Sequence, residues 1–234
     1  TISTTTGNSV SIKAPSNVAG LYNYNLVSVS DASPDLCSSV QTGTAAITIQ
    51  ALPTATITGT TAVCQNAVQP LVTFTGAGGT APYRFTYNIN GGATQTVNTT
   101  AASNTVTLNV PTNIIGPFVY NLLSVTEGGA NQCSRTYTTG SATFTVNPLP
   151  TANISGSTSL CQNAARPLIT FTGANGTAPY TFTYNINGGT PQTITTTTGN
   201  FVTLQAPTNT DGVFNYNLLS VKDGSSTQCL QNQT

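Results

Sequence analysis

Apolar and polar residues alternate along most of the chain with a period of two. Val106, Leu108 and Val110 fall on one side of an extended strand, and Thr107 and Asn109 fall on the other. This alternation is typical of strands with one buried face, and no apolar stripe of period 3.6 is long enough for a helix. In the middle of the chain the pattern predicts seven short strands, near residues 55–59, 71–75, 84–90, 94–99, 104–110, 118–126 and 135–146.

Turns rich in glycine and asparagine separate the predicted strands. Asn90-Gly91-Gly92 is a hairpin signal, because asparagine and glycine tolerate positive φ. Seven short strands at this spacing predict an all-β fold, an immunoglobulin-like β-sandwich. Tyr120 follows the turn into the sixth strand, where it predicts a tyrosine corner whose hydroxyl bonds the turn.

The chain consists of copies of one unit of about 97 residues. Thr73–Gly92 recurs as Thr170–Gly189 with two differences in twenty positions, at an offset of 97. The repeat predicts three domains: residues 1–52 as the C-terminal half of a truncated repeat, 53–149 as a complete repeat, and 150–234 as a repeat lacking its last strand. Short proline-containing joints predict a stiff, extended rod, and we interpret the chain as part of a longer polypeptide.

The composition excludes several function classes. Charged residues make up 4% of the chain, five Lys and Arg against five Asp and Glu, so there is no basic patch for nucleic acid. The absence of histidine removes imidazole as a base or metal ligand. No apolar stretch approaches the roughly 20 residues of a membrane helix, so membrane insertion is not expected in these residues. We expect no enzyme, no metal and no cofactor.

Five cysteines recur with the repeat. Cys64 and Cys133 flank the second copy, and Cys161 and Cys229 flank the third. We predict one disulfide inside each domain, Cys64–Cys133 and Cys161–Cys229, with the partner of Cys37 upstream of residue 1. A rival pairing of neighbours, such as Cys133–Cys161, would place the two sulfurs a strand length or more apart, and free thiols are the other alternative. Disulfides imply an oxidising compartment outside the cytosol.

Candidate ligand contacts are few. Tyr83 and Tyr180 flank a loop and, if exposed, could stack on sugar rings; Asn90 and Asn187 are the other candidate glycan contacts. An acid recurs at the end of the sixth strand of each copy, as Asp31, Glu127 and Asp223. One repeated carboxylate per copy is poor for calcium, so we favour a turn-capping role.

Longer phrases carry a resemblance to a known family. The sequence PLPTA is followed by CQNA, by a PL[VI]TFTGA…GTAPY…FTYNINGG segment and by YNLLSV. These phrases, which span essentially the whole chain, resemble the repeats of the SprB-like gliding-motility adhesins of Bacteroidota. The resemblance implies a very long filament, exported by type IX secretion and moved by the cell-envelope motility machinery. It implies no catalytic residues.

The sequence therefore predicts a non-enzymatic stalk segment of a long bacterial cell-surface adhesin. Its extracellular repeats would contact one another and give reach and multivalent attachment to surface polysaccharide or to an abiotic surface, in gliding motility. Two alternatives stay open: a carbohydrate-binding repeat module, and a subunit of a surface fibre completed by strands from its neighbours.

Overall fold

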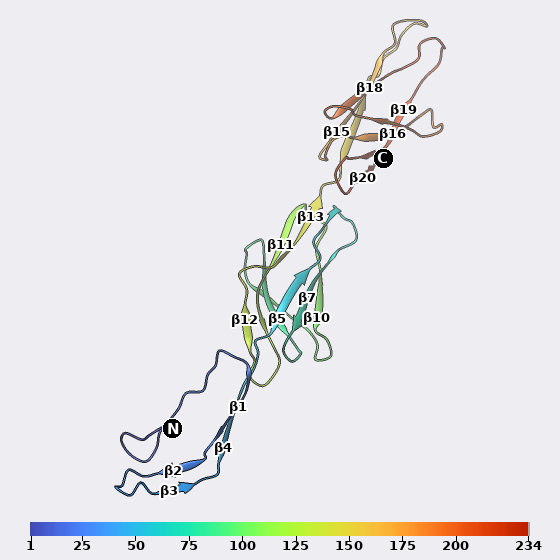
Figure 1. Cartoon of the computed structure of the whole chain (residues 1–234). Helices are drawn as coiled ribbons and strands as arrows, with labels where there is room; N and C mark the ends of the chain where they lie inside the picture. The colour runs from blue at the N-terminus through green and yellow to red at the C-terminus, as the bar shows by residue number, and fades with distance from the viewer. Residues whose placement is uncertain (234) are drawn as a thin grey trace.

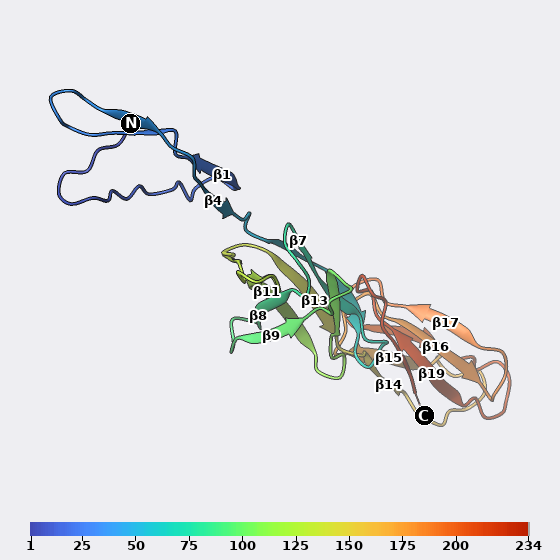
Figure 2. The same ribbon diagram turned by 90° about the horizontal axis from the view of Figure 1, so that it is seen from below.

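The structure is a computed structural model that describes residues 1–233, and all of its regular elements are β-strands. The three repeats lie end to end along a rod, with the first repeat at one tip and the third at the other (Figures 1 and 2). None of the described residues belongs to a helix long and apolar enough to cross a membrane.

The second repeat is a sandwich of two sheets. One sheet has the strand order β10-β7-β5, and the other has the order β6-β13-β11-β8-β9 with β12 beside β11. The strands are β5 (Thr54–Thr58), β6 (Thr61–Cys64), β7 (Leu71–Ala77), β8 (Arg84–Ile89), β9 (Gln95–Asn98), β10 (Thr105–Asn109), β11 (Gly116–Thr126), β12 (Ser134–Thr136) and β13 (Ser141–Asn147).

Period-two alternation places the core between these sheets. In β7 and β13 every second residue is buried, so that Phe74 and Phe144 are fully enclosed. Phe74 packs on Phe85 and Tyr87 of the facing sheet with ring centroids 5.6 and 5.1 Å apart, distances typical of favourable aromatic pairs. The predicted all-β tandem sandwich is confirmed.

Two elements differ from the seven predicted strands. The first is β6, which pairs in parallel with β13 and places Cys64 opposite Asn147. The second is β12, a short strand that pairs with the end of β11 and is separate from β13. Sequence pattern missed both because a four-residue and a three-residue strand are too short for alternation to distinguish them from a loop.

The third repeat has the same two sheets with fewer strands. Their orders are β14-β15-β18 and β17-β16-β19-β20. The strands are β14 (Thr151–Ser155), β15 (Leu168–Ala174), β16 (Thr181–Ile186), β17 (Gln192–Thr195), β18 (Phe201–Gln205), β19 (Tyr216–Lys222) and β20 (Leu230–Asn232). Among residues 150–233 no strand corresponds to β6 or β13.

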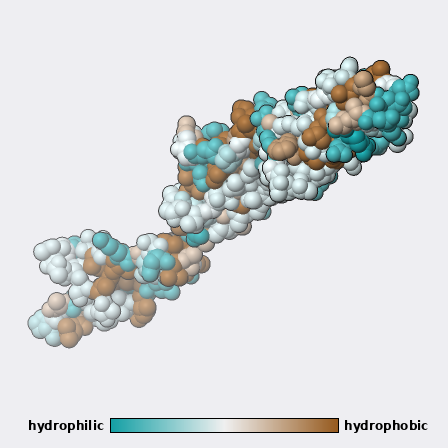
Figure 3. Space-filling model, turned by 90° about the horizontal axis from the view of Figure 1, so that it is seen from above, coloured by the Kyte–Doolittle hydropathy of each residue, from teal (hydrophilic) through white to brown (hydrophobic). Residues whose placement is uncertain are grey.

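The first repeat consists of two hairpin-like pairs. Strand β1 (Gly20–Asn25) pairs with β4 (Thr44–Ile49), and β2 (Ser28–Ser30) pairs with β3 (Ser38–Val40). Because no second sheet covers them, side chains such as Leu21 and Val40 are exposed. Figure 3 shows areas of apolar surface, in brown, on the first repeat at the left end of the view.

A buried proline marks the start of each of the two later repeats. Pro53 is fully buried, and Pro150 is buried at the equivalent position. Since proline restricts φ, the backbone at this position of both connections has little conformational freedom.

Candidate functional site

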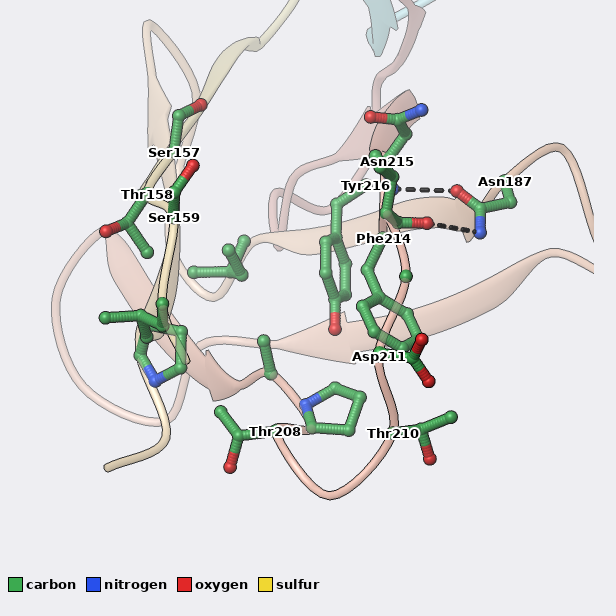
Figure 4. Close-up of a pocket in the computed structure, with 18 of the residues that line it drawn as sticks. Ser157, Thr158, Ser159, Asn187, Thr208, Thr210, Asp211, Phe214, Asn215 and Tyr216 are labelled. Atoms are coloured by element: carbon green, nitrogen blue, oxygen red, sulfur yellow. Dashed lines mark hydrogen bonds between the residues drawn. The ribbon is translucent and has the colours of Figure 1, made fainter. Parts of the chain in front are cut away.

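An open groove of about 960 Å³ lies in the third repeat. Figure 4 shows Ser157, Thr158 and Ser159 on one side of it and Phe214, Asn215 and Tyr216 on the other. The floor includes Ile169 and Ala206 from the sandwich core.

The groove occupies the place that β13 takes in the second repeat. The wall at residues 157–162 corresponds to residues 60–65, which contain β6, at an offset of 97. The wall at residues 213–217 corresponds to residues 117–121 of β11, at an offset of 96. Strand β13 pairs with both of these segments in the second repeat.

The strand that fills this position in the second repeat is β13 (Ser141–Asn147), with alternating burial. Its apolar residues Ala142, Phe144 and Val146 point into the core and are at most 2% exposed. On the edge of β19 that faces away from β16, residues 220–222 pair with β20, and residues 216–218 have no strand partner among the described residues.

The predicted sugar-stacking role of Tyr83 and Tyr180 is wrong, because both rings are buried. Tyr83 is 1% exposed and Tyr180 is 4% exposed. The Tyr83 hydroxyl donates to the Gly79 carbonyl at 2.7 Å and accepts from the Gly79 amide at 3.0 Å, and Tyr180 makes the same pair of bonds with Gly176. Tyr83 has the same strand parity as Phe85 and Tyr87, which was the signal for burial.

A tyrosine hydroxyl does hydrogen-bond to the backbone of a turn four residues upstream, but the residue is Tyr83 rather than Tyr120. Tyr120 lies in the core beside Tyr87, with ring centroids 6.0 Å apart. Burial, together with the neighbouring Tyr87, raises the pKa of Tyr120 above the ordinary tyrosine value.

Asn90 and Asn187 are exposed, but their amides serve the fold. Asn90 has positive φ, its Nδ2 donates to the Pro117 carbonyl at 3.0 Å, and its Oδ1 accepts from the Val119 amide at 2.8 Å. Asn187 makes the equivalent bonds to Val213 and Asn215, drawn in Figure 4. Glycan contact at these two residues stays a prediction.

The predicted disulfide pairing is corrected by the structure. The disulfide joins Cys64 to Cys229, with Cα atoms 5.5 Å apart, and so connects the second repeat to the third. Cys37, Cys133 and Cys161 are free thiols. The predicted pairs Cys64–Cys133 and Cys161–Cys229 do not form.

The reason lies in strand direction. Cys64 ends β6, which runs parallel to β13 and so ends at the pole facing the next repeat. Cys133 follows β11, which runs antiparallel to β13 and so ends at the opposite pole. The two cysteines of one repeat are therefore a strand length apart, whereas Cys64 and the closing cysteine of the following repeat meet at one joint.

The acid in each copy organises the loop that carries the closing cysteine. The backbone amides of Asp31, Glu127 and Asp223 each donate to the carbonyl of the cysteine six residues later, at 3.0 Å in all three copies. Asp223 is 3% exposed, and its Oδ1 also accepts from the Cys229 amide and the Ser225 hydroxyl, both at 2.8 Å. The turn-capping role predicted for these acids matches this geometry, and residues 1–233 contain no group of three or more metal-ligating side chains.

Polar contacts accompany the disulfide at the joint between the second and third repeats. Asn147, opposite Cys64 in the β13–β6 pair, donates through Nδ2 to the Thr227 hydroxyl at 2.9 Å. Cys229 is fully buried there. The site thus holds two adjacent repeats in one fixed arrangement.

No protein-family model matches the sequence, and no curated protein matches it. One similar solved structure belongs to a 1.5-MDa bacterial ice-binding adhesin, in work on its retention on the host cell surface. It is 15% identical over 77% of this chain and 62% of its own, with a TM-score of 0.39. A tetra-tandem repeat from the extending region of a large adhesion protein is 17% identical over 92% of this chain and 56% of its own, with a TM-score of 0.28.

This chain therefore spans less than two thirds of the length of either structure, and both TM-scores are below 0.5. The fold assignment rests on the sheet topology of the chain itself.

Proposed function

We propose that this chain is a non-enzymatic stalk segment of a long bacterial cell-surface adhesin. The observation that carries the proposal is the end-to-end arrangement of copies of one sandwich, cross-linked at the joint between the second and third (Figure 1). Copies in series add length, and weak contacts repeated along a rod add avidity.

The polar, nearly uncharged exterior supports a role in contact with a surface. Threonine, asparagine and serine rather than charged residues solvate the rod, so surface polysaccharide or an abiotic surface can approach without strong electrostatic repulsion. The resemblance to gliding adhesins adds the finer proposal that the filament acts in gliding motility and leaves the cell by type IX secretion.

Immunogold labelling with antibodies raised against the 234-residue chain tests the stalk role. We expect label along filaments outside cells that produce the protein, and loss of the label when external protease is added. Label confined to the cell interior would overturn the proposal. Deletion of the gene tests the finer proposal. Deletion cells that still glide at the normal speed would exclude a role of the filament in gliding motility.

A glycan array probed with the same chain separates spacer from adhesive unit. A stalk segment gives no saturable binding to any sugar. Selective binding that is lost when Asn90 and Asn187 are both changed to alanine would assign the repeat itself as a carbohydrate-binding module.

A further inference from the structure

The disulfide changes which residues can carry tension along the rod. It joins Cys64 to Cys229 across a sequence separation of 165. A pulling force applied to the two ends of the chain follows the shortest covalent path, which runs from residue 1 to Cys64, crosses to Cys229 and continues to the end. The 164 residues between the two cysteines lie off that path.

We propose that disulfides between adjacent repeats form a covalent bypass that makes the rod nearly inextensible. The bypass leaves each sandwich core in parallel with the load instead of in series with it. Unfolding of a core then adds no length between the ends. This proposal deepens the stalk function and rests on it for the presence of tension, but its test does not require any adhesive activity.

The joint between the first and second repeats shows the same arrangement, with the closing cysteine, Cys133, in place. The Cys133 thiol donates to Oε1 of Gln50 at 3.5 Å. Gln50 is the counterpart of Asn147, at an offset of 97, and Asn147 is the residue opposite Cys64 in the β13–β6 pair. Cys133 therefore lies beside the position that the first repeat's counterpart of Cys64 would take.

One rule accounts for all five cysteines. The opening cysteine of one repeat bonds the closing cysteine of the next, and Cys64–Cys229 is the one such pair whose two members both lie within the 234 residues. The partners that the rule assigns to Cys37, Cys133 and Cys161 have positions outside this numbering. These three are the free thiols.

In a longer array of this repeat the rule produces two interleaved covalent paths. Each repeat would contribute residues 53–64 to one path and residues 133–149 to the other, in the numbering of the second repeat. The intervening 65–132, 68 of about 97 residues, would lie off both. Each bridge forms when two thiols lose two protons and two electrons, which reduce one disulfide of a thiol-disulfide oxidoreductase to two thiols.

Single-molecule pulling of the oxidised 234-residue chain from its two ends tests the bypass. Because the disulfide holds residues 64 and 229 only 5.5 Å apart at their Cα atoms, unfolding of the second and third repeats should add no contour length. After dithiothreitol is added, the same chain should gain roughly 540–590 Å, at about 3.3–3.6 Å per residue for the released segment.

Two matched variants complete the experiment. The double variant Cys133→Ser, Cys161→Ser should keep the disulfide and gain no contour length, because both replaced thiols are free. Cys229→Ser should gain the full contour length without reductant. Disulfides inside each repeat would instead release two segments of 68 and 67 residues on reduction, roughly 230 Å each. Two such steps, or full extension of the oxidised wild type, would overturn the proposal.

Discussion

Replacing the Tyr83 hydroxyl tests whether this residue serves the fold or a ligand. Tyr83→Phe keeps the ring, which packs against Gly76, and removes only the oxygen that bonds both the amide and the carbonyl of Gly79. Tyr180→Phe removes the equivalent oxygen in the third repeat. We therefore consider the double variant, in which both complete copies of the loop lose the same two hydrogen bonds.

The expected cost follows from the lost bonds. Each net hydrogen bond contributes about 0.5–1.5 kcal/mol, so the loss of two per repeat should lower the free energy of unfolding by about 1–3 kcal/mol per repeat. For a domain of this size that corresponds to a fall in melting temperature of roughly 4–8 °C per kcal/mol. Differential scanning calorimetry measures the fall, and hydrogen exchange should show faster exchange of the Gly79 amide.

Tyr87→Phe is the matched control. Its hydroxyl makes one bond, to Oε1 of Gln95 at 3.0 Å, and the glutamine side chain can turn to water when the bond is lost. We expect less than about 1 kcal/mol of destabilisation. An unchanged melting temperature for the Tyr83→Phe and Tyr180→Phe variant, combined with loss of sugar binding, would refute the structural role of these tyrosines.

Three further predictions concern the same repeat. Gly76→Ala places a Cβ 2.5 Å from the Tyr83 ring, so thermal unfolding should show a loss of about 1–3 kcal/mol. Glu127→Ala removes the acceptor of the Thr80 amide at 2.8 Å; we expect a loss of about 1–3 kcal/mol and faster exchange of that amide, and unchanged exchange would contradict it. Burial raises the pKa of Tyr120 in the folded state. The stability that the neutral Tyr120 side chain contributes is therefore complete below the pKa of the unfolded state, near 10, and is lost as pH rises through the folded-state pKa. In urea unfolding measured above about pH 10, Tyr120→Phe should make the free energy of unfolding depend less steeply on pH.

The fold could be predicted because its signal is local and repeated. Alternation in segments such as Ser141–Asn147 identifies strands with one buried face, and the recurrence of Thr73–Gly92 as Thr170–Gly189 identifies the unit. The same alternation also placed Tyr83 on the buried side. The prediction of an exposed ring gave more weight to the neighbouring loop than to the strand parity.

The cysteine pairing required more than local pattern. Cys64 and Cys133 are the only cysteines of the second repeat, which made them natural partners in sequence. Their distance depends on which pole each strand reaches, and therefore on the parallel β6–β13 pair, a four-residue contact that alternation does not reveal. The outward course of β13 toward the next repeat was a usable signal, since it requires β11 and its loop to end at the other pole.

Sequence by itself determined the strands, the 97-residue unit and the low charge of the rod, because each of these is a property of residues close together or directly compared. Tertiary structure alone decided that Cys64 bonds Cys229 and that the Tyr83 hydroxyl is used internally. These features arise where strands distant in the chain meet at a sheet edge or at a pole. The physical reason is that strand direction and sheet order, which no short segment encodes, decide which side chains come within bonding distance.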